Sequence, residues 1–172
     1  MPRDPSEFLA LERAIAPFAE GFSVRSENNG ALSGVYLFRT GGSRKPEIGV
    51  FAGLLIDAAT YPHFPRARAP EALVMAYVKP VRSGVRRALV EGEESVFRTA
   101  HSTLLPIASP EPFEFHEAEP GALARRRRLP EGAESLMDRR LLEFCRGSLA
   151  LLGQAGLLDA LRQFGFTESP TT

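Results

Sequence analysis

Two apolar runs joined by a proline-rich segment, residues 50–80, constrain the fold of this chain more than any other stretch. The first run covers residues 50–56 and is apolar apart from Gly53, and the second covers residues 73–78. Between them, Pro62 and Pro65 fix the backbone φ angle and disfavour a helical conformation in the residues before them. The pattern predicts a buried strand, a stiff extended connection and a second buried strand.

The sequence before this stretch predicts a helix followed by antiparallel strands. Asp4 can cap a helix, Pro5 suits its first position, and apolar residues then recur at spacings of three and four, so we expect a helix over residues 5–19. Strands are expected over residues 22–25, 35–40 and 48–56, with a tight turn at Asn28-Asn29-Gly30. We expect the helix to pack on the sheet through these residues: Phe8, Leu11 and Ile15 against Val35, Leu37, Leu54 and Ile56.

The second half of the chain is less regular. Residues 73–78 predict a fourth strand, and residues 85–90 a short edge strand blunted by arginines. Prolines and glutamates predict an extended charged loop over residues 109–129, followed by C-terminal helices over 130–165. The whole chain, including the helix-plus-sheet core over 5–108, is therefore expected to be one α+β domain: an N-terminal helix, an antiparallel four- to five-stranded meander, and C-terminal helices packed on the sheet.

Composition excludes several function classes. The 21 basic and 21 acidic residues give zero net charge, which argues against nucleic acid as a partner and makes a homo-oligomer easier to form. A single cysteine excludes an internal disulfide and a thiolate zinc cluster, and the three histidines lack helical metal-site spacing, so no metal and no cofactor are expected. No apolar run approaches the roughly 20 residues that span a bilayer, which predicts a cytoplasmic protein without a membrane partner.

A helix, a four-strand meander, a Tyr-Pro-x-x-Pro segment and a terminal helix pair resemble the ubiquitin-conjugating fold. The matching residues lie within about 5–80 and include the strand at 51–56 with Tyr61, Pro62 and Pro65. Two departures concern Arg66, where the family carries a second proline, and Lys79-Pro80, which keeps only the proline of its His-Pro-Asn turn.

The resemblance also bears on activity. Enzymes of this family hold a thioester on a cysteine shortly after the His-Pro-Asn turn, but residues 79–100 contain no cysteine. The resemblance therefore implies an inactive variant or a related RWD-like domain. Such domains bind partners, among them ubiquitin-like proteins, without carrying out transfer.

Four groups of residues are candidate site residues. Cys145 stands among Leu141, Leu142 and Phe144, which favours a buried thiol, although an exposed acceptor thiol is the alternative. Phe113 and Phe115 lie in proline- and glutamate-rich text and are expected to fold back or to dock into a neighbour. The other candidates for binding are the proline-rich segment (Tyr61, Pro62, Phe64 and Pro65) and four arginines that could grip phosphates or an acidic surface (Arg125, Arg126, Arg127 and Arg128).

These observations favour a non-catalytic protein-binding domain that acts as an adaptor or assembly component. Its partner would be a ubiquitin-like protein or further copies of the chain. Three alternatives stay open: a structural subunit of a phage or bacterial particle, an immunity protein that binds a toxin, and a conjugation enzyme that uses Cys145.

Overall fold

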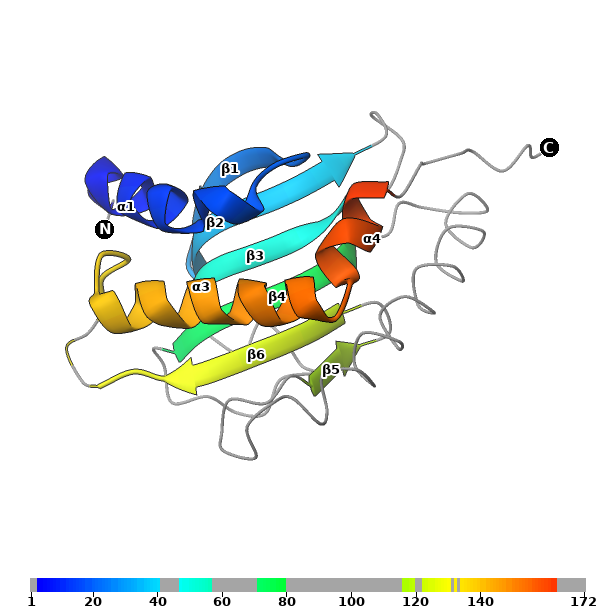
Figure 1. The fold of residues 1–172 in the computed structure, drawn as a ribbon. Helices are drawn as coiled ribbons and strands as arrows, with labels where there is room; N and C mark the ends of the chain where they lie inside the picture. Colours follow the sequence, from blue (N-terminus) through cyan, green and yellow to red (C-terminus); the bar gives the residue numbers. More distant parts are fainter. Residues whose placement is uncertain are drawn as a thin grey trace.

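The structure is a computed structural model that describes residues 3–40, 47–56, 71–79, 116–119, 122–130, 132 and 134–163. One antiparallel sheet carries a layer of helices (Figure 1), which confirms the predicted α+β class with an N-terminal helix and C-terminal helices. Its described strands follow the order β1-β2-β3-β4-β6-β5. The strands are β1 (Ser23–Asn28), β2 (Leu32–Thr40), β3 (Glu47–Leu55), β4 (Glu71–Lys79), β5 (His116–Glu119) and β6 (Ala122–Arg128).

The first hairpin forms at the predicted turn. The main-chain N–H of Asn29 donates to the carbonyl of Leu32 over 2.9 Å, and the Asn29 side-chain oxygen accepts from the N–H groups of Ala31 and Leu32. Both strands extend closer to this turn than the sequence predicted, because β1 continues to Asn28 and pairs there with Ser33. The short side chain of Asn29 thus accepts hydrogen bonds from backbone N–H groups at the end of the three-residue connection, 29–31.

The two central apolar runs are neighbouring antiparallel strands, as the pattern predicts. Strands β3 and β4 pair from Glu47 opposite Lys79 to Leu55 opposite Glu71. Both faces of these strands are covered, which explains why their sequences are nearly continuous in apolar residues rather than alternating. Residues 57–70, which join them, lie outside the described residues, and so do the candidates Tyr61, Pro62, Phe64 and Pro65.

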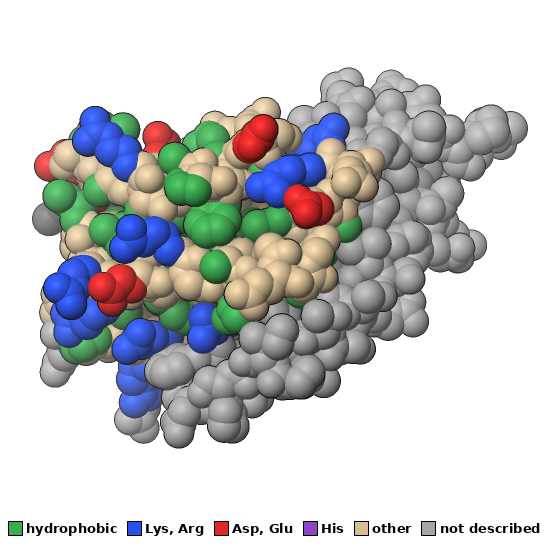
Figure 2. All heavy atoms as spheres, viewed as in Figure 1, with side chains coloured by type: hydrophobic (Ala, Val, Ile, Leu, Met, Phe, Trp, Pro, Cys, Tyr) green, Lys and Arg blue, Asp and Glu red, His purple; other side chains and the backbone are tan. Residues whose placement is uncertain are grey.

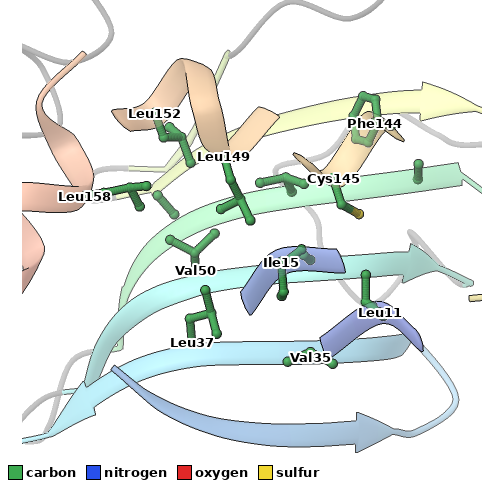
Figure 3. Close-up of a cluster of buried hydrophobic side chains, with 14 of the residues drawn as sticks. Leu11, Ile15, Val35, Leu37, Val50, Phe144, Cys145, Leu149, Leu152 and Leu158 are labelled. Carbon is green, nitrogen blue, oxygen red and sulfur yellow. The ribbon is translucent and has the colours of Figure 1, made fainter. Parts of the chain in front are cut away.

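The helices cover one face of the sheet. They are α1 (Pro5–Ile15), which a 3-10 helix η1 (Ala16–Phe18) continues, α3 (Arg139–Gln154) and α4 (Leu157–Gln163). Figure 3 shows Leu11 and Ile15 of α1 directed toward the same apolar cluster as Cys145 and Leu149 of α3, over the strands. The cluster includes Val35, Leu37 and Leu54, with Phe8 and Ile56 partly buried against it, so the predicted packing is confirmed.

The last helical region begins later than expected, at Arg139 rather than at 130. The side chain of Asp138 caps α3 by accepting from the N–H of Arg140 over 2.9 Å. Upstream, the carboxylate of Glu7 accepts from the N–H of Leu136 and the hydroxyl of Ser135, each over 3.0 Å. These bonds tie the chain before the cap to α1, so it enters α3 from an anchored turn.

The far end of the helix layer is also tied to the N-terminal region. Arg162 of α4 donates from Nε to the carbonyl of Glu20 over 2.6 Å and from Nη2 to the carbonyl of Phe18 over 2.9 Å. Helix α4 is the last of the C-terminal helices predicted over residues 130–165. These bonds tie α4 to the segment that follows α1 and η1, on the same face of the sheet.

The opposite face of the sheet carries a second apolar cluster that is rich in aromatic rings. The rings of Tyr36 and Phe51 lie 5.0 Å apart, and those of Tyr36 and Tyr77 meet edge to face at 5.7 Å. The other buried members of this cluster are Ala31, Leu32, Leu55, Leu73 and Ala124.

The extended charged loop expected over 109–129 is wrong for the residues that the structure describes there. His116–Glu119 and Ala122–Arg128 are β5 and β6, and β6 pairs with β4 along its whole length. Leu123 is buried on the helix face and Ala124 on the opposite face, so this charged segment has the alternation of a strand. The predicted edge strand over 85–90, and Phe113 and Phe115, lie outside the described residues.

In the described part of the chain, no single helix has the length and apolar composition to cross a membrane. Helices α3 and α4 have that length and composition only when they are counted together, and a bend of 73° separates them.

Candidate functional site

Cys145 lies fully buried in α3, pointing toward the sheet (Figure 3), so the predicted buried thiol is confirmed. Burial raises the pKa of this thiol to about 12. The thiolate is the nucleophilic form of cysteine. Here the sulfur is shielded from solvent, and the raised pKa keeps it protonated at neutral pH. The alternative of an exposed acceptor thiol at Cys145 is therefore wrong.

The four arginines of β6 do not form one cluster, because successive side chains of a strand point to opposite faces. Arg125, on the helix face, donates to the hydroxyl of Ser148 over 3.0 Å, and its guanidinium lies 5.2 Å from the centre of the Phe144 ring. Burial, with a smaller effect of Arg127, lowers the pKa of Arg125. Arg126, on the opposite face, is buried in a two-pronged ion pair with Glu71, with two N–O distances of 2.9 Å.

At least two arginines of this run therefore stabilise the fold. Arg125 holds α3 to β6, and Arg126 joins β6 to β4. Arg128 is exposed at the end of the strand. That the run binds phosphates or an acidic surface stays a prediction.

A polar network on the aromatic face holds β1 to the rest of the sheet. The carboxylate of Glu47 in β3 accepts from the hydroxyl of Tyr77 over 2.5 Å and from both terminal nitrogens of Arg25, in β1, over 3.1 and 3.2 Å. The Arg25 guanidinium also lies over the rings of Tyr36 and Phe38, at 4.8 and 4.5 Å.

This network holds strand β1 in place and does not form a catalytic arrangement. Burial, together with the bond to Glu47, raises the pKa of Tyr77, which keeps the phenol as a hydrogen-bond donor. Arg25 reaches across β2 to Glu47, so it sets the orientation of β1 at the rim of the sheet. Within residues 3–163, where the structure describes them, no three His, Cys, Asp or Glu side chains are grouped to hold a metal ion.

Strand β1 is an edge of the sheet, and its outward backbone groups can be assigned from the hairpin. The N–H of Asn29 points toward β2, and hydrogen bonding alternates along an antiparallel pair. The N–H and C=O groups of Val24, Ser26 and Asn28 therefore face away from β2. Among the described strands β1 pairs with β2 alone, and all three of these residues are exposed.

An apolar groove lies beside this edge, between the first helical segment and strands β1 and β2. It has a volume of about 290 Å³, and most of its lining is apolar: Leu9, Ile15, Ala16, Ala19, Val24 and Leu37, with Glu12 and Arg13. Leu9 and Val24 are 45% and 46% exposed, and of the other large apolar side chains that the structure describes only Met137 is as exposed. Figure 2 shows the helix-covered face, where hydrophobic side chains reach the surface between charged ones.

The hydroxyl of Ser26 donates to the carboxylate of Glu12 over 3.2 Å, which links the edge strand to α1 beside the groove. The outward backbone groups of β1 thus lie next to the apolar groove, on a strand that is held in place by its side-chain contacts. We call this combination, made up of β1 and the groove lined by Leu9 and Val24, the β1 edge site.

The β1 edge site does not follow from the sequence. The pattern predicts a strand over 22–25, but nothing local shows which strands lie at the rim of a sheet. One feature of the sequence does indicate an edge strand: β1, with the sequence SVRSEN, has a single large apolar residue and two charged residues.

No family model, curated protein or solved structure matches this chain.

Proposed function

We propose that this chain is a non-catalytic protein-binding domain, an adaptor or assembly component, that receives an extended segment of its partner along the β1 edge site. The observation that carries the proposal is the row of outward N–H and C=O groups at Val24, Ser26 and Asn28, beside an apolar groove. In strand addition, main-chain hydrogen bonds supply affinity, and a neighbouring pocket that receives a side chain supplies specificity.

The chemically capable groups of the described chain support a binding role. The thiol of Cys145 is in the core, Glu71 and Arg126 are bound to each other, and Glu47 holds Arg25 and Tyr77. Each of these groups stabilises the fold, whereas the edge and the groove of the β1 edge site are surface features of the described residues with backbone groups and apolar side chains to offer a partner.

The resemblance to inactive ubiquitin-conjugating variants and RWD-like domains belongs to the same proposal. A first helix, four antiparallel strands that pair in chain order and C-terminal helices are the layout that the resemblance implies. A ubiquitin-like protein as a partner and a cytoplasmic location are the corresponding expectations.

Site-specific photocrosslinking tests the proposal. A photoreactive amino acid at Val24, in the cells that naturally produce the chain, is expected to give a discrete protein adduct. The same amino acid at Arg146, exposed on α3, is the matched control and is expected to give none.

The variant Ser26→Pro makes the test specific to strand addition. The Ser26 N–H faces outward, so proline at this position removes a donor for the partner without breaking a bond to β2. We expect Ser26→Pro to abolish the adduct at Val24. An adduct that Ser26→Pro leaves unchanged, or equal adducts at Val24 and Arg146, would contradict the proposal.

A further inference from the structure

We infer that the partner of the β1 edge is a second copy of this chain, with β1 pairing antiparallel to β1 about a two-fold axis at Ser26. This inference rests on the proposed function and names its partner. It starts from two opposite charges, Arg25 and Glu27, which are two residues apart and therefore share one face of the strand.

The backbone restricts how two such edges can pair. Only Val24, Ser26 and Asn28 present outward N–H and C=O groups, so hydrogen-bonded pairs must join residues of this set. A two-fold axis at Ser26 places Ser26 opposite Ser26 and Val24 opposite Asn28 of the second copy. All three outward residues of each copy are then used, and the pairs exchange about six hydrogen bonds.

Side-chain charge selects this register over its neighbours. With the axis at Ser26, Arg25 lies opposite Glu27 of the second copy, and the contact occurs twice. With the axis at Arg25, the two arginines face each other, and with the axis at Glu27 the two glutamates do. Directly opposed like charges destabilise an antiparallel pair and opposite charges stabilise it, so the sequence of β1 favours one register.

Neither charged group is saturated by its contacts within the chain. The Arg25 side chain is 37% exposed and uses one N–H from each terminal nitrogen for Glu47, which leaves further donors of its five. The contact of Glu27 is a bond from the side-chain amide of Asn29 to one carboxylate oxygen. The zero net charge of the chain removes overall repulsion between copies.

The register is tested with two single variants that are complementary to each other. Arg25→Glu and Glu27→Arg each place like charges opposite one another in the homodimer, so each alone is expected to dimerise at least about tenfold more weakly than the parent chain. Mixed in equal amounts, the two variants restore both opposite-charge contacts, and dimers of one copy of each are expected. Sedimentation velocity on the full chain, over a range of concentrations, measures these equilibria.

Controls separate register from folding. Glu143→Arg makes the same charge change on the exposed face of α3 and is expected to leave dimerisation unchanged. Because Arg25→Glu also removes the contact with Glu47, circular dichroism must show that it is folded. Ser26→Pro, which keeps that contact, is expected to be folded and monomeric, and the Val24, Ser26 and Asn28 amides of the parent chain are expected to gain protection from hydrogen exchange on dimerisation.

Each of the following results from sedimentation would overturn the inference: a parent chain that stays monomeric at the highest concentration, a dimer that Ser26→Pro and Glu27→Arg leave intact, or variants that do not recover on mixing. A crosslink from Val24 to a different protein, with a monomeric parent chain, overturns self-pairing while the proposed function stands. Absence of any adduct at Val24 overturns both.

Discussion

The buried ion pair between Glu71 and Arg126 gives the sharpest test of the packing on the aromatic face. Its side chains are 12% and 9% exposed, and two hydrogen bonds of 2.9 Å join them. Replacing Arg126 with leucine leaves the Glu71 carboxylate desolvated and without the guanidinium. Breaking such a pair from one side costs about 3–5 kcal/mol in free energy of unfolding. In a chain of this size, that corresponds to a fall in Tm of about 6–20 °C.

The double variant Glu71→Leu/Arg126→Leu separates the pair from the packing around it. Removing both charges also removes the desolvation cost, so we expect the double variant to be within about 1 kcal/mol of the parent chain. Arg128→Leu, an exposed change on the same strand and the same face, is the matched control and should cost no more than about 0.5 kcal/mol. Urea unfolding followed by circular dichroism measures all four chains. The reasoning is refuted if Arg128→Leu costs as much as Arg126→Leu, or if the double variant is as unstable as the single one.

Three other positions report on close packing, on the thiol and on a helix cap. Gly34→Ala would press a Cβ against the carbonyl oxygen of Ala52, so a loss of about 3 kcal/mol is expected in urea unfolding. Gly30→Ala, with no atom within 4 Å of the new Cβ, should be nearly neutral, and equal losses at the two positions would contradict this. Native Cys145 should react with a thiol reagent only as fast as the chain unfolds, and rapid native labelling would disprove its burial. Asp138→Ala should cost about 1 kcal/mol at neutral pH. Hydrogen bonds from Arg140 lower the pKa of Asp138 from 3.8 to about 2, so this difference should be complete above pH 3.8 and fade as the pH falls toward 2; a difference that persists in acid would contradict it.

Local patterns predicted much of the sheet and the helix layer. The stripe through Leu11 and Ile15 specifies the buried face of α1, and the apolar runs specify β3 and β4, because each pattern lies within one element. The turn at Asn29 likewise depends on its own side chain. These features need no knowledge of distant residues.

Strand β6 could not be predicted in the same way, because its stability depends on residues far away in the sequence. Arg126 pairs with Glu71, which lies 55 positions earlier in the sequence, and Arg125 bonds to Ser148, which lies 23 positions later. Without these partners, four adjacent arginines are typical of a solvated loop. The candidate site could not be predicted for the same reason. Strand β1 is an edge because the sheet continues beyond β4 to β6 and β5, on the side away from β1, and no residue of β1 indicates this order.

The contacts of Arg162 with the carbonyls of Phe18 and Glu20 have a consequence for how the protein is made. The helix layer is built from both ends of the described chain, so the apolar face of the first four strands has no complete cover while the ribosome is still adding α3 and α4. A nascent chain of this protein therefore exposes apolar surface on this face of the sheet until α3 and α4 have been synthesised.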